Sequence, residues 1–353
     1  MEKSKIAVII VSFNGKSYLG DCLRCLEEQT LAPEKVIVID NNSKDGSVEF
    51  LKEYSLKTEL NLELIFSKEN LGFTGGNNLG MKKALEEKMD YIFLLNQDTE
   101  MEKDTLGKLL EAADREKDLF CLQPLILFAD RKDVVQTAGD RIHFLGFGYL
   151  GDYLVRLEDF KKKIKRREEI PYASGAAMFI VSDALREVGF FDEDYFLYHE
   201  DMDLCLRARI LKKKILLVPQ AFVYHKYKSG ITPLKWSYSE RNRQLMLLKF
   251  YKLPTLLLVS PFWFMMEIGS LLYSALIGAL ALKIKGYFEI LSLATKFLKK
   301  RKEIQKTRKI RDKELSNYLD GEFHFQGLAS PLFYLINPIL GSGWRMIKKI
   351  MFW

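Results

Sequence analysis

Hydrophobic and polar positions alternate along the first hundred residues in a pattern that predicts strands and helices in turn. Short runs of β-branched and other apolar residues are typical of strands that are buried on both faces. The predicted strands cover residues 6–12, 35–40, 62–66 and 91–95, and the predicted helices cover residues 16–29, 47–54 and 77–88. This alternation predicts an α/β fold of right-handed βαβ units around a mostly parallel sheet.

The next part of the chain continues this pattern less regularly. We expect strands at 118–127, 172–181 and 215–224 and helices at 103–117, 182–188 and 201–212. The stretch 130–170 is rich in glycine and charge and predicts a lid or a β-excursion. After about residue 235 the pattern changes to long helices. We therefore predict an α/β domain over residues 1–235 and a helical region over residues 236–353.

Polar loops follow three of the predicted strands, and ligands of parallel sheets bind beyond the carboxyl ends of the strands. Asp40 ends the second strand, where its carboxylate can accept hydrogen bonds from a nucleobase or a ribose. The alternative is that Asp40 forms a turn or caps the next helix. The sequence argues strongly against a nicotinamide site, because residues 12–17 read Ser-Phe-Asn-Gly-Lys-Ser and contain one glycine, not Gly-x-Gly-x-x-Gly.

Two further residues suggest a metal site. Asp98 follows the predicted strand 91–95, and a carboxylate at a strand end is a natural ligand for a hard divalent cation that bridges phosphate oxygens. Mg²⁺ and Mn²⁺ both prefer such oxygen donors. His225 directly follows another strand. A lone histidine is more often structural than a ligand, but together with Asp98 its neutral imidazole could complete the site.

An acidic segment follows residue 189. Six carboxylates are interleaved with aromatic residues between residues 190 and 203. Aromatic neighbours can desolvate a carboxylate, which raises its pKa and makes it a better general base. The alternative is that Glu200, Asp201 and Asp203 favour the positive end of the helix that begins there. Both interpretations hold together, because the start of a helix positions a residue rigidly.

The basic residues of the chain are concentrated in one segment. The whole chain carries a formal charge of +7, whereas residues 283–313 alone hold twelve Lys or Arg against three Asp or Glu. Just before it, residues 255–282 contain one charged residue, Glu267, and are long enough to span a membrane. Basic residues lie on both sides of this stretch, against the positive-inside rule. Pro261 and two glycines permit a kinked hairpin that enters and leaves one leaflet, while the basic segment binds anionic lipid headgroups.

A buried helical core or an oligomer interface is the alternative interpretation of residues 255–282. We expect no nucleic-acid partner for the basic segment, because the apolar stretch beside it would have no role there. The apolar run Ile6–Val11 is too short for a signal peptide or a spanning helix. Four scattered cysteines, two of them in a Cys-x-x-Cys pair, do not form a disulfide framework. We therefore expect a peripheral or monotopic position on the cytoplasmic face of the cell membrane.

Seven segments, in order, resemble those of a family 2 glycosyltransferase with the GT-A fold, and more narrowly of the bacterial rhamnosyltransferase-like branch. They span residues 5–245 and read VIIVSFNG, VIVIDNNSKDGS, NLGFTGGNN, FLLNQDTE, SGAAMFI, GFFDEDYFLYHEDMDLCLRAR and VYHKYKSG. The family's D-x-D metal motif falls on residues 96–98. Its first carboxylate is replaced by the amide of Asn96, so Asp98 is expected to contact the metal directly.

The resemblance also implies roles for the other candidates. Asp40 contacts the nucleobase, His225 is a metal ligand, Glu200 lies on the acceptor side and Asp201 is the catalytic base. The residues expected to line the donor site are Ser12, Asn14, Asp40, Asn42, Asn70, Gly72, Asn77 and Asn96. An inverting, single-displacement transfer follows, in which Asp201 takes the proton of an acceptor hydroxyl.

The expected donor is a nucleotide-diphosphate sugar, with L-rhamnose from dTDP-rhamnose favoured over UDP-linked hexoses or galactofuranose. The expected acceptor is a glycan or a polyprenyl-linked saccharide in cell-surface polysaccharide assembly. A sugar nucleotidyltransferase is one alternative, although it needs a glycine-rich basic loop after the first strand. The other is a non-catalytic membrane scaffold that retains the fold.

Overall fold

The computed structural model describes residues 4–164, 168–227, 230, 232–323 and 331–353. The chain forms two compact units. The first comprises residues 1–140, 150–208 and 213–227, and the second comprises residues 141–149, 209–212 and 228–353. Compared with the predicted division at residue 235, the second unit also takes in two short segments from earlier in the chain.

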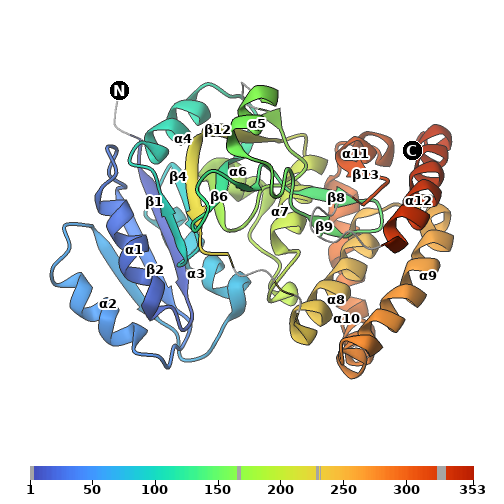
Figure 1. Ribbon diagram of the computed structural model, residues 1–353, viewed down its shortest axis with the longest axis horizontal. Coiled ribbons are helices and arrows are strands. Elements are labelled where there is room, and N and C mark those ends of the chain that lie inside the picture. The colour runs from blue at the N-terminus through green and yellow to red at the C-terminus, as the bar shows by residue number, and fades with distance from the viewer. Residues whose placement is uncertain (1–3, 165–167, 228–229, 231, 324–330) are drawn as a thin grey trace. The chain divides into compact units, whose positions relative to one another are not determined.

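The first unit is built on a mixed sheet in the order β10-β12-β6-β11-β4-β1-β2-β3, with β5 paired to β12 and β7 paired to β6 (Figure 1). Its strands are β1 (Ile6–Ser12), β2 (Lys35–Asp40), β3 (Leu62–Phe66), β4 (Tyr91–Leu95), β5 (Thr99–Met101), β6 (Leu119–Phe128), β7 (Val135–Thr137), β10 (Glu168–Glu169), β11 (Ala177–Val181) and β12 (Lys214–His225). The predicted α/β fold is confirmed.

Strands β3, β2, β1 and β4 are parallel, as the sequence predicts. Ser12 lies opposite Asp40 in the register of β1 and β2, so the polar loops after these strands share one edge of the sheet. The later strands depart from the parallel pattern. β11 runs antiparallel between β4 and β6, and its first residue, Ala177, lies opposite Leu95 at the end of β4. The segment before β11 therefore reaches the same edge.

The helices of this unit cover both faces of the sheet. They are α1 (Lys16–Glu27), α2 (Ser47–Ser55), α3 (Gly72–Glu86), α4 (Thr105–Asp114), α5 (Leu157–Lys163), α6 (Ser182–Val188) and the first turns of α7 (Glu200–Ile210). The buried face of α1 packs into one cluster with Val8 and Ile10. α3 packs on the opposite face, where a Cβ atom on Gly80 would lie 2.5 Å from Cγ2 of Ile9.

Helix α3 begins at Gly72, five residues before the predicted start. Three glycines in its first turns lower helix propensity, and this is why the sequence favours a loop there. Tertiary contacts override that preference. The N–H of Phe73 donates to the carbonyl oxygen of Phe196 at 3.1 Å, and Gly80 lets the helix approach the sheet closely.

The second unit is mainly helical. It contains α8 (Pro233–Phe250), α9 (Leu253–Leu276), α10 (Leu280–Thr307), α11 (Asp312–Leu315) and α12 (Pro331–Ile350), with a small sheet of β13 (Leu319–Asp320), β8 (Arg141–His143) and β9 (Gly148–Tyr149). The irregular stretch 130–170 thus contributes short strands to both units, which agrees with a β-excursion. Residues 165–167 of that stretch lie outside the described residues.

The hairpin predicted within residues 255–282 turns at Gly278, one of the two glycines expected to permit it, and not at Pro261. α9 continues through Pro261 for 24 residues, and the chain turns at Ile277–Ala279, where Gly278 has a φ of +71°. Glycine tolerates this left-handed conformation. Among the described residues, α9 is the one helix that is long and apolar enough to cross a membrane.

Candidate active site

Three buried polar atoms lie without a partner, within the described residues, at the ends of β1 and β2. They are Oγ of Ser12, Oδ2 of Asp40 and Oδ1 of Asn41. The other carboxylate oxygen of Asp40 accepts the N–H of Ser43 at 2.9 Å, so Asp40 does form the turn that was the alternative interpretation. Because buried polar atoms are almost always paired, three orphaned atoms at one edge of a sheet indicate a polar ligand. Sequence reasoning missed Asn41 and placed its neighbour Asn42 in this role.

The loops after β1 and β2 are tied to each other. The N–H of Asn14 donates to Oγ of Ser43 at 2.9 Å, and Oδ1 of Asn14 accepts the N–H of Lys44 at 2.8 Å. Asn14 and Asn42 have φ values of +49° and +65°, which asparagine tolerates better than most residues. The side chain of Asn14 therefore shapes the loop, and donor binding by Asn14 and Asn42 stays a prediction.

Polar residues near the start of α3 hold the helix in place. Oδ1 of Asn70 accepts the N–H of Gly72 at 2.9 Å, and Nδ2 of Asn77 donates to the carbonyl oxygen of Phe73 at 2.9 Å. Gly72 has a φ of +70°, and a Cβ atom there would lie 2.6 Å from the carbonyl oxygen of Phe196. Each residue thus has a structural role, and the predicted contacts with the donor remain untested.

The structure brings Asp98 and His225 together. Nε2 of His225 lies 3.2 Å from Oδ1 of Asp98, and Nδ1 of His225 lies 3.0 Å from Oε1 of Gln136. In the tautomer in which Nδ1 donates to Oε1, Nε2 has its lone pair available beside the carboxylate of Asp98. Two acceptors that face each other fit a cation, and a second partner on the far nitrogen is usual for a metal-binding histidine. Sequence reasoning missed Gln136.

This pair could provide two protein ligands for a divalent cation. Among the described residues, no group of three or more His, Cys, Asp or Glu side chains could hold a metal ion. The remaining coordination positions would therefore belong to phosphate oxygens or water, as is common for Mg²⁺. Asn96 lies on the same edge, where its N–H donates to the carbonyl oxygen of Ala176 at 2.9 Å.

The predicted base, Asp201, is held by two backbone N–H groups. Its Oδ2 accepts the N–H of Gly175 at 3.0 Å, and its Oδ1 accepts the N–H of Met202 at 2.7 Å. Burial raises the pKa of Asp201 above its ordinary value, and these hydrogen bonds oppose the shift. Burial and the nearby charge of Asp201 raise the pKa of Glu200 strongly, and its Oε2 has no partner in the described part of the chain.

A third buried acid belongs to this group, and sequence reasoning did not find it. The pKa of Asp140 is raised to about 8, chiefly by burial and also by the charge of Asp201, while a hydrogen bond from Thr137 opposes the rise. Asp140 lies in the glycine-containing stretch before β8, where no periodic pattern marks it. Asp140 and Glu200 thus both lie near enough to Asp201 for its charge to raise their pKa values.

The backbone just before α7 is strained. Phe196, Tyr198 and His199 have φ values of +62°, +67° and +69°. Left-handed conformations of non-glycine residues cost about 1–3 kcal/mol each and persist where the surroundings fix them, often at functional sites. Here the strain positions the first turn of α7, which carries Glu200 and Asp201.

Comparison of the sequence with known protein families shows to which family the chain belongs. Residues 7–189, more than half of the chain, match the family described as Glycosyl transferase family 2. The chain belongs to glycosyl transferase family 2. The matched range ends before Asp201 and His225, so the positions of these two residues in this family 2 protein rest on the geometry above.

Two relatives illustrate how far the likeness extends. The low-salt glycan biosynthesis hexosyltransferase Agl10 of Haloferax volcanii is 23% identical over 205 residues, which cover 58% of this chain and 61% of the relative. The N-acetylglucosaminyl-diphospho-decaprenol L-rhamnosyltransferase of Mycobacterium tuberculosis is 26% identical over 236 residues, which cover 62% of this chain and 75% of the relative. The chain thus spans less than two thirds of the length of the Haloferax relative.

A solved structure supports the fold. The crystal structure of GalNAc-T7 with UDP, GalNAc and Mn²⁺ superposes with a TM-score of 0.55 at 19% identity, over 69% of this chain and 48% of that one. At this identity the likeness establishes the fold alone. The mixed α/β sheet of this family 2 protein is therefore GT-A-like.

Proposed function

We propose that the chain is an inverting glycosyltransferase that moves a sugar from a nucleotide-diphosphate donor to a hydroxyl of an acceptor. The observation that carries this proposal is the approach of Nε2 of His225 to Oδ1 of Asp98, at 3.2 Å. Family membership and the unpaired polar atoms of Ser12, Asp40 and Asn41 give further support, because these atoms suit a nucleobase and its ribose.

In this proposal Asp201 accepts the proton of the acceptor hydroxyl as the hydroxyl oxygen forms a bond to the anomeric carbon. The bond from that carbon to the diphosphate breaks in the same step. A raised pKa makes Asp201 a stronger base, and the N–H groups of Gly175 and Met202 fix the direction of its carboxylate. A divalent cation, Mg²⁺ or Mn²⁺, held by Asp98 and His225 would supply positive charge to the departing diphosphate.

For the substrates we infer L-rhamnose from dTDP-rhamnose as donor and a polyprenyl-linked saccharide or other glycan as acceptor. The name of the Mycobacterium relative, N-acetylglucosaminyl-diphospho-decaprenol L-rhamnosyltransferase, supports L-rhamnose as the sugar and a polyprenyl-linked saccharide as the acceptor. Mn²⁺ in the structure of GalNAc-T7 supports the metal. We also propose that the protein works on the cytoplasmic face of the membrane, because its second unit contains the apolar helix α9 and the basic residues of α10.

Thermal unfolding of the full chain with dTDP-rhamnose, UDP-glucose and UDP-galactofuranose, each with and without Mn²⁺, tests the proposal. We expect the dTDP sugar to raise the unfolding temperature most, and only when the metal is present. Asp98→Ala should remove the metal-dependent part of this rise. Glu53→Ala, which changes an exposed acid on α2, is the matched control and should keep it.

Product analysis separates the alternatives. A glycosyltransferase slowly hydrolyses its donor and releases a nucleoside diphosphate, whereas a sugar nucleotidyltransferase consumes a nucleoside triphosphate and releases pyrophosphate. A scaffold does neither. Metal-independent stabilisation by every sugar, or Asp98→Ala behaving like Glu53→Ala, would contradict the proposed role of Asp98.

A further inference from the structure

Helix α9 has its polar residues inside the second unit and its apolar residues outside. Four of its five buried residues are polar or charged; the five are Thr255, Val259, Glu267, Ser270 and Ser274. Its exposed large apolar residues are Leu253, Leu257, Phe264, Met265, Ile268, Leu272, Tyr273 and Leu276. A surface helix of a water-soluble protein shows the opposite arrangement. The environment that α9 faces is therefore apolar.

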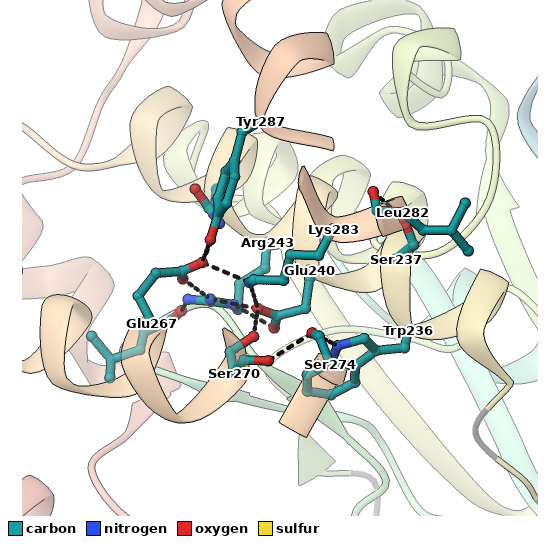
Figure 2. Close-up of polar contacts among 12 residues, drawn as sticks. Trp236, Ser237, Glu240, Arg243, Glu267, Ser270, Ser274, Leu282, Lys283 and Tyr287 are labelled. Atoms are coloured by element: carbon teal, nitrogen blue, oxygen red, sulfur yellow. Dashed lines mark hydrogen bonds and ion pairs between the residues drawn. The ribbon is translucent and has the colours of Figure 1, made fainter. Parts of the chain in front are cut away.

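Four buried charged residues form a cluster between α8, α9 and α10, a place where a soluble protein usually has apolar residues (Figure 2). Arg243 of α8 pairs with Glu240 at 3.0 Å and with Glu267 of α9 at 2.9 Å. Lys283 of α10 pairs with the same two carboxylates at 2.6 Å each. Two positive and two negative charges are thus neutralised inside the unit. The one charged residue of α9 consequently needs no contact with water.

Hydroxyl groups complete this buried network. Ser270 donates to Glu240, Tyr287 donates to Glu267, and the indole N–H of Trp236 donates to Oγ of Ser274 at 2.8 Å (Figure 2). Residues of α8 and α10 thus supply hydrogen-bond and ion-pair partners for the polar side chains of α9. These side chains do not need water as a partner. α8 packs against α9 and is rich in charged residues, so the side of α9 that contacts α8 does not face lipid.

The helices α10 and α12 also carry a row of exposed apolar residues, which we call an apolar stripe. The exposed apolar residues of α10 are Leu280, Ile284, Phe288, Leu291 and Leu298, and those of α12 are Leu335, Ile339, Met346 and Ile350. Within each helix these positions recur at spacings that share one face. α9 packs against both helices, and Gly343 of α12 lies so close to Phe262 that a Cβ atom would clash with its ring.

The positive charge beside these apolar stripes indicates which partner covers them. The apolar part of α10 passes into a basic part, where exposed lysines include Lys296, Lys299, Lys302 and Lys306. Residues 283–313 hold twelve basic and three acidic residues. A second copy of the chain would bring two such positive segments together, whereas anionic lipid headgroups would neutralise them.

We propose that the outward apolar residues of α9, α10 and α12 form one lipid-facing surface that inserts into a single leaflet of an anionic phospholipid bilayer. The charged cluster of Glu240, Arg243, Glu267 and Lys283 holds the three helices α8, α9 and α10 together from the inner side. This surface makes the membrane partner of the proposed function specific, and it does not depend on which sugar is transferred.

Vesicle sedimentation of the full chain tests the surface. We expect the protein to bind phosphatidylcholine vesicles that contain phosphatidylglycerol, and to bind pure phosphatidylcholine more weakly. The combined change Leu257→Gln, Ile268→Gln and Leu272→Gln should lower the partition coefficient at least tenfold. Leu56→Gln is the matched control, because Leu56 is 86% exposed and lies in the first unit. It should leave binding unchanged.

Further measurements distinguish the other occupants. Lys299→Glu with Lys302→Glu should weaken binding to the anionic vesicles and leave the weaker binding to phosphatidylcholine unchanged. Equal vesicle binding by the triple variant and the wild type would overturn the proposal, as would no binding by the wild type. So would a wild-type dimer that the triple variant dissociates in the absence of lipid. Cleavage of the bound protein by a protease enclosed inside the vesicles would overturn insertion into one leaflet in favour of a spanning helix.

Two controls keep this test separate from the proposed sugar transfer. The triple variant should show the far-ultraviolet circular dichroism of the wild type, because the changed residues are exposed. Its stabilisation by dTDP-rhamnose and Mn²⁺ should also equal that of the wild type. Loss of lipid binding with donor stabilisation intact would support the surface, whereas failure of donor stabilisation in both proteins would contradict only the proposed donor.

Discussion

Nε2 of His225 lies 3.2 Å from Oδ1 of Asp98, although one residue ends the last long strand and the other follows β4. The pairing of two strands explains the approach. β5 runs antiparallel to β12, with Thr99 opposite His225. Asp98 directly precedes β5, so this pairing places its carboxylate next to the imidazole of His225. A strand of three residues thus forms the junction on which the proposed metal site depends.

Replacing Gln136 should weaken metal binding without removing a ligand. In Gln136→Leu the imidazole of His225 loses the acceptor that fixes its ring and its tautomer. Loss of such a partner typically lowers metal affinity by about 10–100-fold. Mn²⁺ titration in the presence of dTDP, followed by electron paramagnetic resonance, measures this affinity. Gln136→Glu retains an acceptor and should lose less; equal affinities in Gln136→Leu and the wild type would contradict the role of Gln136.

Replacing Asp201 should lower the rate of sugar transfer and leave the affinity for the donor unchanged. Asp201→Asn keeps the shape of the side chain and removes its basicity, so we expect turnover to fall by about 10²–10⁴-fold, the usual contribution of a general base. Calorimetric titration with the donor and Mn²⁺ should give a dissociation constant near that of the wild type. A matching loss of donor affinity would show that Asp201 binds the donor instead of acting as the base.

The pKa of Asp140 predicts a pH dependence of stability. An aspartate in the unfolded chain has a pKa of about 3.9, whereas burial raises that of Asp140 to about 8 in the folded protein. Between these values the folded state binds a proton that the unfolded state does not. The free energy of unfolding therefore falls as the pH rises through this window, by up to about 1.4 kcal/mol per pH unit.

Asp140→Asn should remove this contribution. The variant should gain stability relative to the wild type between about pH 5 and pH 8, because an amide does not lose a proton in that range. Urea unfolding at several pH values measures the difference. Asp133→Asn changes an exposed residue of the same segment and should follow the wild type. Parallel curves for Asp140→Asn and the wild type would exclude a raised pKa at this position.

Breaking the charged cluster of the second unit should destabilise that unit. Arg243→Met leaves Glu240 and Glu267 with Lys283 as the one remaining cation of the cluster. Removal of one partner from a buried ion pair typically costs about 3–5 kcal/mol. Denaturant unfolding measures the loss. Arg24→Met, an exposed ion-pair residue on α1, should cost less than about 1 kcal/mol. Similar values for the two variants would show that the cluster contributes little.

The parts of the fold that follow from local pattern were predicted well. The runs Ile6–Ser12, Lys35–Asp40 and Tyr91–Leu95 are strands with the predicted bounds, because continuous β-branched and apolar runs suit a sheet covered on both faces. The start of α3 and the course of the chain at Pro261 differ from prediction. Both depend on contacts between segments distant in sequence, or on packing that lets α9 continue through Pro261.

The candidate site divides in the same way. Asp98 and His225 stand at strand ends, where chemistry is expected, and the structure places them together. Gln136 and Asp140 had no such signal, because they lie in short irregular segments and their roles come from residues far away in the chain. Asn41 was passed over for its neighbour, since the sequence does not say which amide of a turn points inward.

The carbonyl oxygen of Phe196 accepts the N–H groups of Phe73 and Thr74 in the first turn of α3. The same peptide begins the left-handed stretch that leads into α7. One oxygen atom therefore joins the two halves of the proposed reaction centre. We therefore expect that a substitution that shifts the beginning of α3 also changes the direction of the Asp201 carboxylate, so that donor affinity and acceptor reactivity change together.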